Sequence, residues 1–389
     1  MGGGYTGLSA ARTLARSGAS VAVLERHRVG WGASGRNGGF VLPGYKPDAI
    51  ELVRRYGIER ARGIFAASLE AIGYVERLIA DEAIDCGFER RGTVTLAGRP
   101  RHLRDLATEQ RALREHFGHE TVLLGPGHLR DEIDSSGYAG GLLDPAAGGL
   151  HPARYCAGLA AAAAKARAAI VEGVEVLGAT RRSGGMTLST SAGPLDADEV
   201  LVATNGYTGA AFPGLRRRVV PVGSYIVATA PLGRDAERLI PRKRVMSDTW
   251  NLLHYFRLSD DGRLVFGGRA SFTPTGVERS SRILAAAIRR VFPSLAAVPI
   301  EFAWSGKVAF ARDQMPHAGR LDGVHYALAY AGHGVALSTW LGARMGEVLA
   351  GRAELPEFTG DPPAIPLYGG RPWFLPAVGA YYRMKDWLR

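Results

Sequence analysis

Apolar residues recur every three or four positions in several stretches of the chain, which is the spacing of helices that bury one face. The first stretch, residues 7–18, carries Leu8, Ala11 and Leu14 on one face and stops at Gly18, a residue typical of helix ends. The same spacing predicts one long helix over residues 48 to about 83, and further helices over 152–167, 280–293 and the stretch after the glycines at 332–334.

Short alternating or β-branched runs between these helices predict strands. The first two are SVAVLE (20–25) and GTVTLAG (92–98). Two further strand-like runs surround a polar hairpin between residues 170 and 209. Strand signals are densest from Val219 to Arg269, where Asp260, Asp261 and Gly262 predict a turn.

A glycine-rich turn opens the chain directly before the first predicted helix. Gly2, Gly4 and Gly7 have the spacing of a dinucleotide fingerprint, in which a tight turn lets backbone amides approach a pyrophosphate at a helix N-terminus. Glu25 ends the following strand, where an acid accepts hydrogen bonds from a ribose hydroxyl. An acid disfavours a 2′-phosphate at this place, so FAD or NAD is expected rather than NADP.

Turn, helix and strand segments of this kind occur at the start, the middle and the end of the chain. The pattern therefore predicts an α/β fold in which two units interleave along the sequence. A doubly wound, Rossmann-like cofactor-binding domain takes residues 1–45, 141–215 and 300–355, an antiparallel-sheet substrate domain takes 46–140 and 216–299, and a Pro- and aromatic-rich tail takes 356–389.

Composition and charge narrow the possible partners. The net charge is +11, from 48 basic and 37 acidic residues, but the basic residues are dispersed, so neither a nucleic-acid nor a membrane partner is expected. The two cysteines, Cys86 and Cys156, are too few for a metal cage or a disulfide framework. Without a signal-peptide pattern or a membrane-spanning run, we expect a cytoplasmic protein that binds no metal.

The first strand of the predicted doubly wound sheet is missing from the sequence, because only Met1 precedes the glycine turn. That strand lies in the middle of such a sheet and contacts neighbours on both edges. We therefore expect the natural start to lie upstream, and the chain to be an N-terminally truncated version.

Five further motifs, in the same order, resemble those of the D-amino-acid oxidase (DAO) superfamily of FAD-dependent flavoproteins. They are GWGASGRNGGFVLPG (30–44), LVATNGYTG (201–209), YFRLSDDGRLVFGGR (255–269), WSGKVAFARDQMPHAGRL (304–321) and AGHGVALSTWLGARMGEVLAG (331–351). The resemblance covers nearly the whole chain, and within the superfamily it is strongest to the gamma-glutamylputrescine oxidase-like branch.

The resemblance implies FAD as the cofactor. It assigns Gly2, Gly4, Tyr5, Thr6 and Gly7 to the pyrophosphate, Glu25 and Arg26 to the adenosine ribose, Ala33, Ser34, Gly35, Arg36, Asn37, Gly38 and Gly39 to the stretch along the flavin, Val176 to the adenine, Thr204 and Asn205 to the phosphates, and Gly332, His333, Gly334, Val335 and Ala336 to the flavin C2 carbonyl. Some relatives attach flavin to a Cys near the last motif or to a His in the early glycine loop. This chain has no Cys after Cys156 and has Asn37 in that loop, so we expect non-covalent FAD.

The resemblance also implies oxidation of an amine, in which a hydride passes from the carbon beside the amine to the flavin and the imine hydrolyses to an aldehyde. Relatives that act on α-amino acids generally clamp the carboxylate with an Arg, but the matching position here is Val308. We therefore expect gamma-glutamylputrescine or a related polyamine derivative as substrate, with O₂, reduced to hydrogen peroxide, or another carrier as electron acceptor. The alternatives are an amino-acid oxidase or dehydrogenase of the glycine or sarcosine type, and a truncated chain without activity.

Five residues are candidates for the substrate pocket. Tyr255, which matches a substrate-facing Tyr of the family, and Lys307 are the candidate catalytic groups, and His254, Arg257 and Trp304 are candidate substrate-binding residues. Strand alternation places His254 on the opposite face from Tyr255. Structural roles remain open as alternatives: a core aromatic for Tyr255, a satisfied polar residue for His254 and a surface charge for Lys307.

Overall fold

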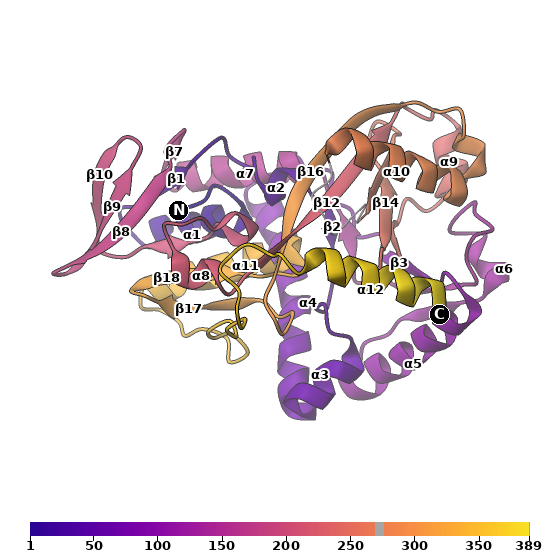
Figure 1. Ribbon diagram of the computed structural model, residues 1–389, viewed down its shortest axis with the longest axis horizontal. Coiled ribbons are helices and arrows are strands. Elements are labelled where there is room, and N and C mark those ends of the chain that lie inside the picture. The colour runs from indigo at the N-terminus through magenta and orange to yellow at the C-terminus, as the bar shows by residue number, and fades with distance from the viewer. Residues whose placement is uncertain (269–275, 389) are drawn as a thin grey trace.

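The structure, a computed structural model, describes residues 1–268 and 276–388. Arg269, the last residue of the predicted strand-rich region, lies outside them. Two units lie side by side in Figure 1: one holds the start of the chain and small groups of parallel strands, and the other is built on one large sheet.

Parallel strand pairs form the centre of the first unit. β1 (Ala22–Glu25) pairs with β7 (Ala169–Glu172), and β11 (Leu201–Val202) pairs with β18 (Val324–Leu328). β17 (His317–Leu321) adds to β18 in the antiparallel direction. A separate antiparallel sheet projects from this unit (Figure 1) and contains β8 (Val176–Arg182), β9 (Gly185–Thr190) and β10 (Gly193–Ala197).

Met1 and Gly2 connect the two parallel pairs. The Gly2 N–H donates to Leu24 O on one side, and Met1 O accepts from the Ala203 N–H on the other, both at 2.9 Å. The backbone at the start of the chain thus makes hydrogen bonds in both directions, as a residue of a central strand does. That a further strand precedes Met1 stays a prediction.

Four helices pack together in the main core of the first unit. They are α1 (Tyr5–Arg16), α4 (Ile58–Asp81), α7 (Pro152–Lys165) and α11 (Gly334–Leu349). Helix α11 approaches α1 closely, because a Cβ added to Gly342 would lie 2.4 Å from Thr6 O. Glycine at this position lets the two backbones touch.

The second unit is an eight-stranded sheet, antiparallel except where β13 meets β3. Its order is β16 (Ile300–Phe310), β12 (Val220–Thr229), β15 (Leu264–Gly268), β14 (His254–Leu258), β13 (Val245–Asp248), β3 (Thr93–Leu96), β5 (Gly141–Asp144) and β4 (Val122–Leu124). One face buries Phe256 and Phe266 in a core shared with α9 (Asp235–Leu239) and α10 (Val277–Val291). The other face carries Tyr255, Arg257 and Trp304 toward the first unit.

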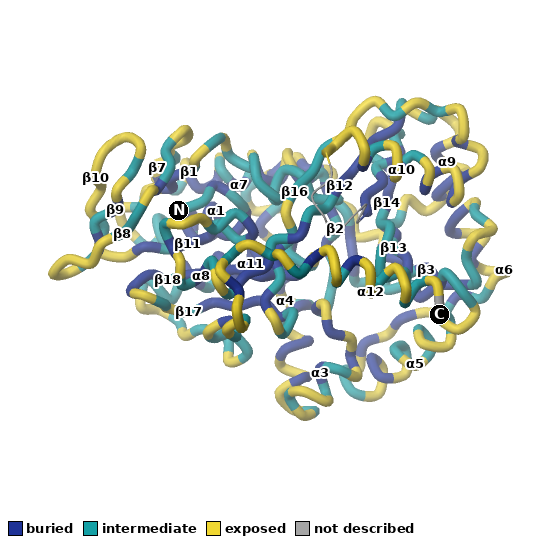
Figure 2. Tube along the Cα trace, in the orientation of Figure 1, coloured by how far each residue is buried: buried dark blue, intermediate teal, exposed yellow. Residues whose placement is uncertain are grey.

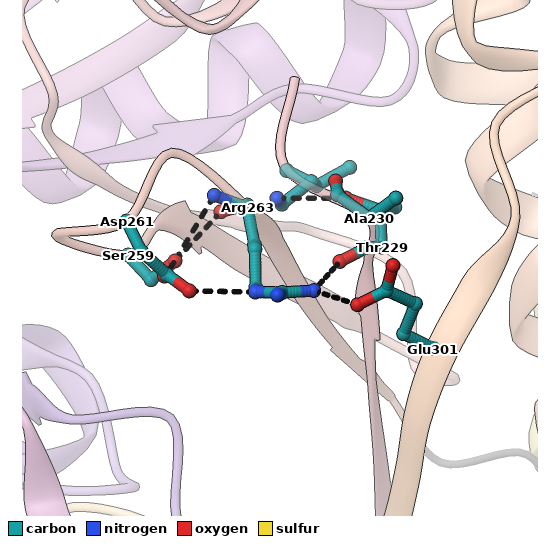
Figure 3. A network of polar contacts seen from close by, with 7 residues as sticks. Thr229, Ala230, Ser259, Asp261, Arg263 and Glu301 are labelled. Atoms are coloured by element: carbon teal, nitrogen blue, oxygen red, sulfur yellow. Dashed lines mark hydrogen bonds and ion pairs between the residues drawn. The ribbon is translucent and has the colours of Figure 1, made fainter. Parts of the chain in front are cut away.

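A polar network ties the outer corner of this sheet together (Figure 3). Arg263 donates to Asp261 at 2.6 Å, to Thr229 O at 2.9 Å and to Glu301 of β16. The guanidinium therefore holds the turn before β15 against both β12 and β16. Exposed ion pairs contribute little individually, so the network defines geometry more than stability.

Short elements complete the described chain: β2 (Phe40–Val41), which pairs with β6 (Gly148–Gly149), α2 (Ala33–Arg36), α3 (Ala49–Tyr56), α5 (Pro100–Phe117), α6 (Pro126–Leu129), α8 (Pro213–Arg216), α12 (Leu375–Leu388), and the 3₁₀ turns η1 (Asn205–Tyr207) and η2 (Pro293–Leu295). No helix in the described ranges combines the length and the apolar character needed to cross a membrane.

Three features differ from the sequence expectations. The predicted long helix is two helices, α3 and α4, because Gly57 between them has φ of 74°, which a helix does not accommodate. Helices α5 and α12 were not predicted. β5 and β16 pair within the eight-stranded sheet, although their residues fall in ranges assigned to the cofactor-binding domain, so strand pairing moves both to the second unit. Helix α4 also falls in a range assigned to the substrate domain, but it packs in the main core of the first unit. The rest of the domain division stays a prediction.

Replacing Gly342 with alanine should destabilise the protein, because the added methyl group would overlap Thr6 O. We expect the free energy of unfolding to fall by about 1–3 kcal/mol in chemical denaturation. Gly63→Ala is the matched control, since Gly63 lies within α4 with open space around a new Cβ and should gain up to about 1 kcal/mol. Equal effects of the two substitutions would contradict close α1–α11 packing.

Glu109 should make stability depend on pH near neutrality. Its carboxylate accepts a 2.9 Å hydrogen bond from Ala49 N at the start of α3, and burial, with the nearby Asp48, raises its pKa from 4.5 to about 7. A raised carboxyl pKa favours the protonated folded state, so stability is lost as pH rises from about 4.5 through 7. In urea unfolding at pH 5 and 8, Glu109→Gln should reduce this loss by about 2 kcal/mol, while Glu115→Gln on the same helix should not.

Candidate functional site

A cavity of about 340 Å³ opens where the start of the chain meets β1, the segment around α2 (residues 30–39, the α2 loop), η1, part of β16 and the start of α11. Many residues with predicted cofactor contacts line it: Gly2, Gly4, Tyr5, Thr6, Glu25, Arg26, Ala33, Ser34, Asn37, Val176, Thr204, Asn205, Gly332, Gly334 and Val335. Segments far apart in the sequence are thus brought together, as a long extended ligand requires.

The other predicted cofactor residues lie outside the lining: Gly7, Gly35, Arg36, Gly38, Gly39, His333 and Ala336. Several support the wall from behind. Gly7 packs against Gly2 O, and Gly35 packs in the same way against Gly30 O. Asn37 fixes the α2 loop, because its amide nitrogen donates to Ala33 O and Ser34 O and its oxygen accepts from Gly39 N at 2.7 Å.

The N-terminus of α1 faces the cavity without a side-chain cap of its own. Gly4 precedes the helix, and the Tyr5 N–H donates instead to Ser34 Oγ at 3.0 Å. Thr6 Oγ1 and the Tyr330 hydroxyl lie 2.8 Å apart beside this turn. The hydroxyls and the positive end of the helix dipole make this turn suited to an anion, as the predicted pyrophosphate contact requires.

Glu25 stands at the end of β1 with both carboxylate oxygens engaged. Oε2 accepts from Gly3 N at 2.7 Å, and Oε1 accepts from His27 N at 2.9 Å. These two bonds fix the carboxylate beside the glycine turn, and each oxygen keeps a lone pair for a ribose hydroxyl. Arg26 forms an exposed ion pair with Glu175 at 3.1 Å.

An aromatic cluster that the sequence did not predict borders the same cavity. Trp31 stacks on His27 with centroids 3.9 Å apart and meets Tyr207 edge to face at 5.8 Å. Arg36 lies over Trp31 and Lys307 over Tyr207, at 4.6 and 5.2 Å from the ring centroids. The sequence signal was limited to an aromatic residue directly after a glycine in each of two glycine motifs. Other unpredicted lining residues include Val174, Leu177, Ala210, Ala211, Val308, Tyr330 and Ser338.

His333 provides a test of whether a flavin fits here. Burial, together with the Lys46 ammonium, lowers the pKa of His333 to about 4, so its ring is neutral at pH 7. Its Nδ1 is buried and has no hydrogen-bond partner within the described ranges, while Gly332 and Gly334 on either side line the cavity. A buried ring nitrogen left without a partner at the N-terminus of α11 suits a ligand with a polar edge, as an isoalloxazine has.

Tyr255 and Trp304 lie on one face of the large sheet. The ring of Tyr255 crosses over Gly267, where a Cβ would lie 2.2 Å from it, and its hydroxyl is 2.8 Å from Ser224 Oγ. Trp304 donates from Nε1 to Arg36 O at 2.9 Å, and Arg36 donates in return to Ser305 O at 3.0 Å. Two aromatic side chains are thus held beside the α2 loop.

The remaining substrate-pocket candidates have different surroundings. Arg257 is buried and donates to Gly38 O, Leu150 O and Leu258 O, which suits a residue that positions the loop. His254 lies on the opposite face from Tyr255, 2.8 Å from the buried Asp248. Lys307 alone among these candidates lines the cavity. No group of three or more His, Cys, Asp or Glu residues with metal-binding geometry occurs in the part of the chain that the structure describes.

Sequence comparison identifies the family. The family model "DAO: FAD dependent oxidoreductase" matches residues 1–348. The chain belongs to the DAO family of FAD-dependent oxidoreductases. It is 34% identical to gamma-glutamylputrescine oxidoreductase of Escherichia coli, over 100% of this chain and 92% of that protein, and 34% identical to the "Probable oxidoreductase OrdL" of Haemophilus influenzae, over 95% and 86%.

A solved structure supports the fold of this DAO-family chain. Glycine oxidase from Geobacillus kaustophilus superposes with a TM-score of 0.76 at 21% identity, covering 91% of this chain and 94% of that one. The predicted fold class and the predicted FAD are confirmed. The protein is therefore an FAD-dependent enzyme of the DAO type that acts on amine or amino compounds.

Glu25→Gln should weaken FAD binding. The amide offers only one oxygen to Gly3 N and His27 N, and it turns a donor toward one of them. We expect the dissociation constant for FAD to rise about 10- to 100-fold, as for loss of a hydrogen bond to a charged group. The measurement is titration of the apoprotein with FAD, followed by flavin fluorescence.

Glu172→Gln is the matched control. Glu172 pairs with Glu25 across β1 and β7 and also accepts from a backbone amide, that of Val29, but it lies outside the cavity lining. Its substitution should leave FAD affinity within about twofold. An equal loss in both variants would mean that the effect comes from the strand pair and not from the ribose contact.

Proposed function

We propose that this protein oxidises a primary amine of the gamma-glutamylputrescine class, with O₂ as the electron acceptor. In the overall reaction, R–CH₂–NH₂, O₂ and H₂O give R–CHO, NH₃ and H₂O₂. The C–H bond beside the nitrogen and an N–H bond break, and a C=N bond forms that water then cleaves. FAD, when bound, would supply the two-electron redox chemistry.

The observation that carries the proposal is the 34% identity to the E. coli gamma-glutamylputrescine oxidoreductase over the whole chain. The chemistry of the sheet face agrees with it. Between Tyr255 and Trp304 the cross-strand positions are Gly267 and Ile226, and Val308 follows on β16. None of these can clamp an α-carboxylate, and the guanidinium of Arg257 on the same face is engaged with three backbone carbonyls.

Residues of this chain would orient the amine and exclude water. The positions between Tyr255 and Trp304, Gly267 and Ile226, are apolar, and among the described strands this face carries no carboxylate that would hold an ammonium ion. Such a surface favours the neutral amine, because a desolvated charge is costly. The neutral form is the one whose nitrogen lone pair can assist loss of hydrogen from the adjacent carbon.

An amine panel tests the proposal. The FAD-loaded protein is mixed with gamma-glutamylputrescine, putrescine, glycine, sarcosine, L-proline and D-alanine, and peroxide, ammonia and aldehyde are measured. We expect kcat/KM for gamma-glutamylputrescine to exceed that for each amino acid by at least about tenfold, since the amino acids lack a partner for their carboxylate.

Two results would count against the proposal. Faster turnover of an α-amino acid would contradict the interpretation of Val308 and favour the glycine or sarcosine type of activity. If the amine reduces an added dye but not O₂, and no peroxide forms, the proposed amine specificity stands and the proposed acceptor, O₂, is wrong.

A further inference from the structure

Helix α12 (Leu375–Leu388) presents an apolar face away from the protein. Its inner side packs Leu375, Val378 and Tyr382 against β12 and Tyr368. The opposite side carries Tyr381, Met384 and Trp387, which are 54%, 52% and 80% exposed. Figure 2 shows α12 on the outside of the molecule with exposed positions along its length.

Helical geometry separates these side chains from the charged ones. Positions 381, 384 and 387 follow one another at three-residue intervals and share a face with Ala377 and Ala380. Arg383 and Lys385 lie about 100° to either side of Met384 around the axis. A surface helix ordinarily turns its polar side outward, so an apolar outer strip with a cation on each flank is the reverse of the usual arrangement.

The only acidic residue in the α12 sequence is turned away from this strip. Asp386 accepts hydrogen bonds from Asn251 N at 3.0 Å and Leu252 N at 3.1 Å, and so anchors the helix to the loop before β14. At the other end, Arg216 lies against Gly370, and Trp373 and Leu367 are 70% and 92% exposed. Exposed apolar side chains therefore also occur in the segment before the helix, which Arg216 contacts at Gly370.

We propose that the outer face of α12 docks on an anionic lipid surface, with the helix lying in the plane of the headgroups. Trp and Tyr prefer the boundary between water and lipid, and flanking Lys and Arg reach lipid phosphates. The two charged residues of α12 that flank the strip, Arg383 and Lys385, are positive, and the chain carries a net charge of +11, which complements anionic lipid. This contact revises the expectation of no membrane partner, and it is independent of the proposed amine oxidation.

The test is vesicle sedimentation with the FAD-loaded full chain. We expect binding to vesicles of phosphatidylcholine with phosphatidylglycerol, and at least about tenfold weaker binding to phosphatidylcholine alone or at high salt. Tyr381→Ser/Met384→Ser/Trp387→Ser should lower binding at least about tenfold. Trp387→Ser alone, the mildest change, should lower it measurably and keeps the test valid if the triple variant does not fold.

Matched controls separate the strip from general hydrophobicity and charge. Ile50→Ser, at an exposed helix position on α3, should leave binding unchanged. Arg383→Gln/Lys385→Gln should weaken binding about tenfold, whereas Arg104→Gln/Arg111→Gln, which removes the same charge from α5, should change it less than threefold. Circular dichroism and flavin absorbance verify the fold of every variant.

Three outcomes would overturn the proposal: no binding to anionic vesicles, binding that the α12 variants do not alter, or equal loss in the α12 and α5 charge variants. Light scattering without lipid tests the alternative that a second copy of this chain binds the strip. If the native chain forms a dimer that the triple variant loses, and vesicles are not bound, the strip is an interface between two copies.

Discussion

The close contact between α1 and α11 is the constraint on which the cofactor site depends. A Cβ at Gly342 would meet Thr6 O at 2.4 Å, and one at Gly346 would meet Ala10 O at 2.8 Å, so the two helix backbones approach as closely as glycine allows. Both N-termini border the same cavity through Gly4 and Gly334. Packing at the middle of the two helices therefore determines where their two positive ends lie beside the cavity in which we expect FAD to bind.

A second set of contacts joins the large sheet to this site. Arg36 and Trp304 exchange hydrogen bonds, so that the α2 loop and β16 hold each other in place. Arg257 reaches from β14 to Gly38 O and Leu150 O. These hydrogen bonds are partly or fully buried, and breaking any one of them would leave a buried polar group without a partner, which is energetically costly. The hydrogen bonds therefore hold the two units at a defined distance.

The sequence predicted the features that depend on local patterns. The glycine turn, Glu25, the helix after Gly334 and the antiparallel character of residues 219–268 were all found from short-range spacing, and the ordered motifs identified FAD. Helix α5 was not predicted, because it buries little beyond Ala112 and Leu113 and its apolar pattern is therefore weak. The place of β5 and β16 in the large sheet, and the pairing of Trp31 with Tyr207, depend on contacts between segments far apart in the chain, which no local window contains.

Arg257 shows how the same residue can be read in opposite ways from sequence and from structure. From the sequence, Arg257 was a candidate substrate-binding residue on the same strand as Tyr255. In the fold, burial lowers the pKa of Arg257, and its guanidinium is satisfied by carbonyl oxygens of Gly38, Leu150 and Leu258. A cation held by carbonyl dipoles can stay charged without an acidic partner, and three of its five N–H groups already donate to the backbone. With Arg257 held by the backbone, the sheet face that carries Tyr255 and Trp304 supports the proposed preference for an uncharged amine over a zwitterion.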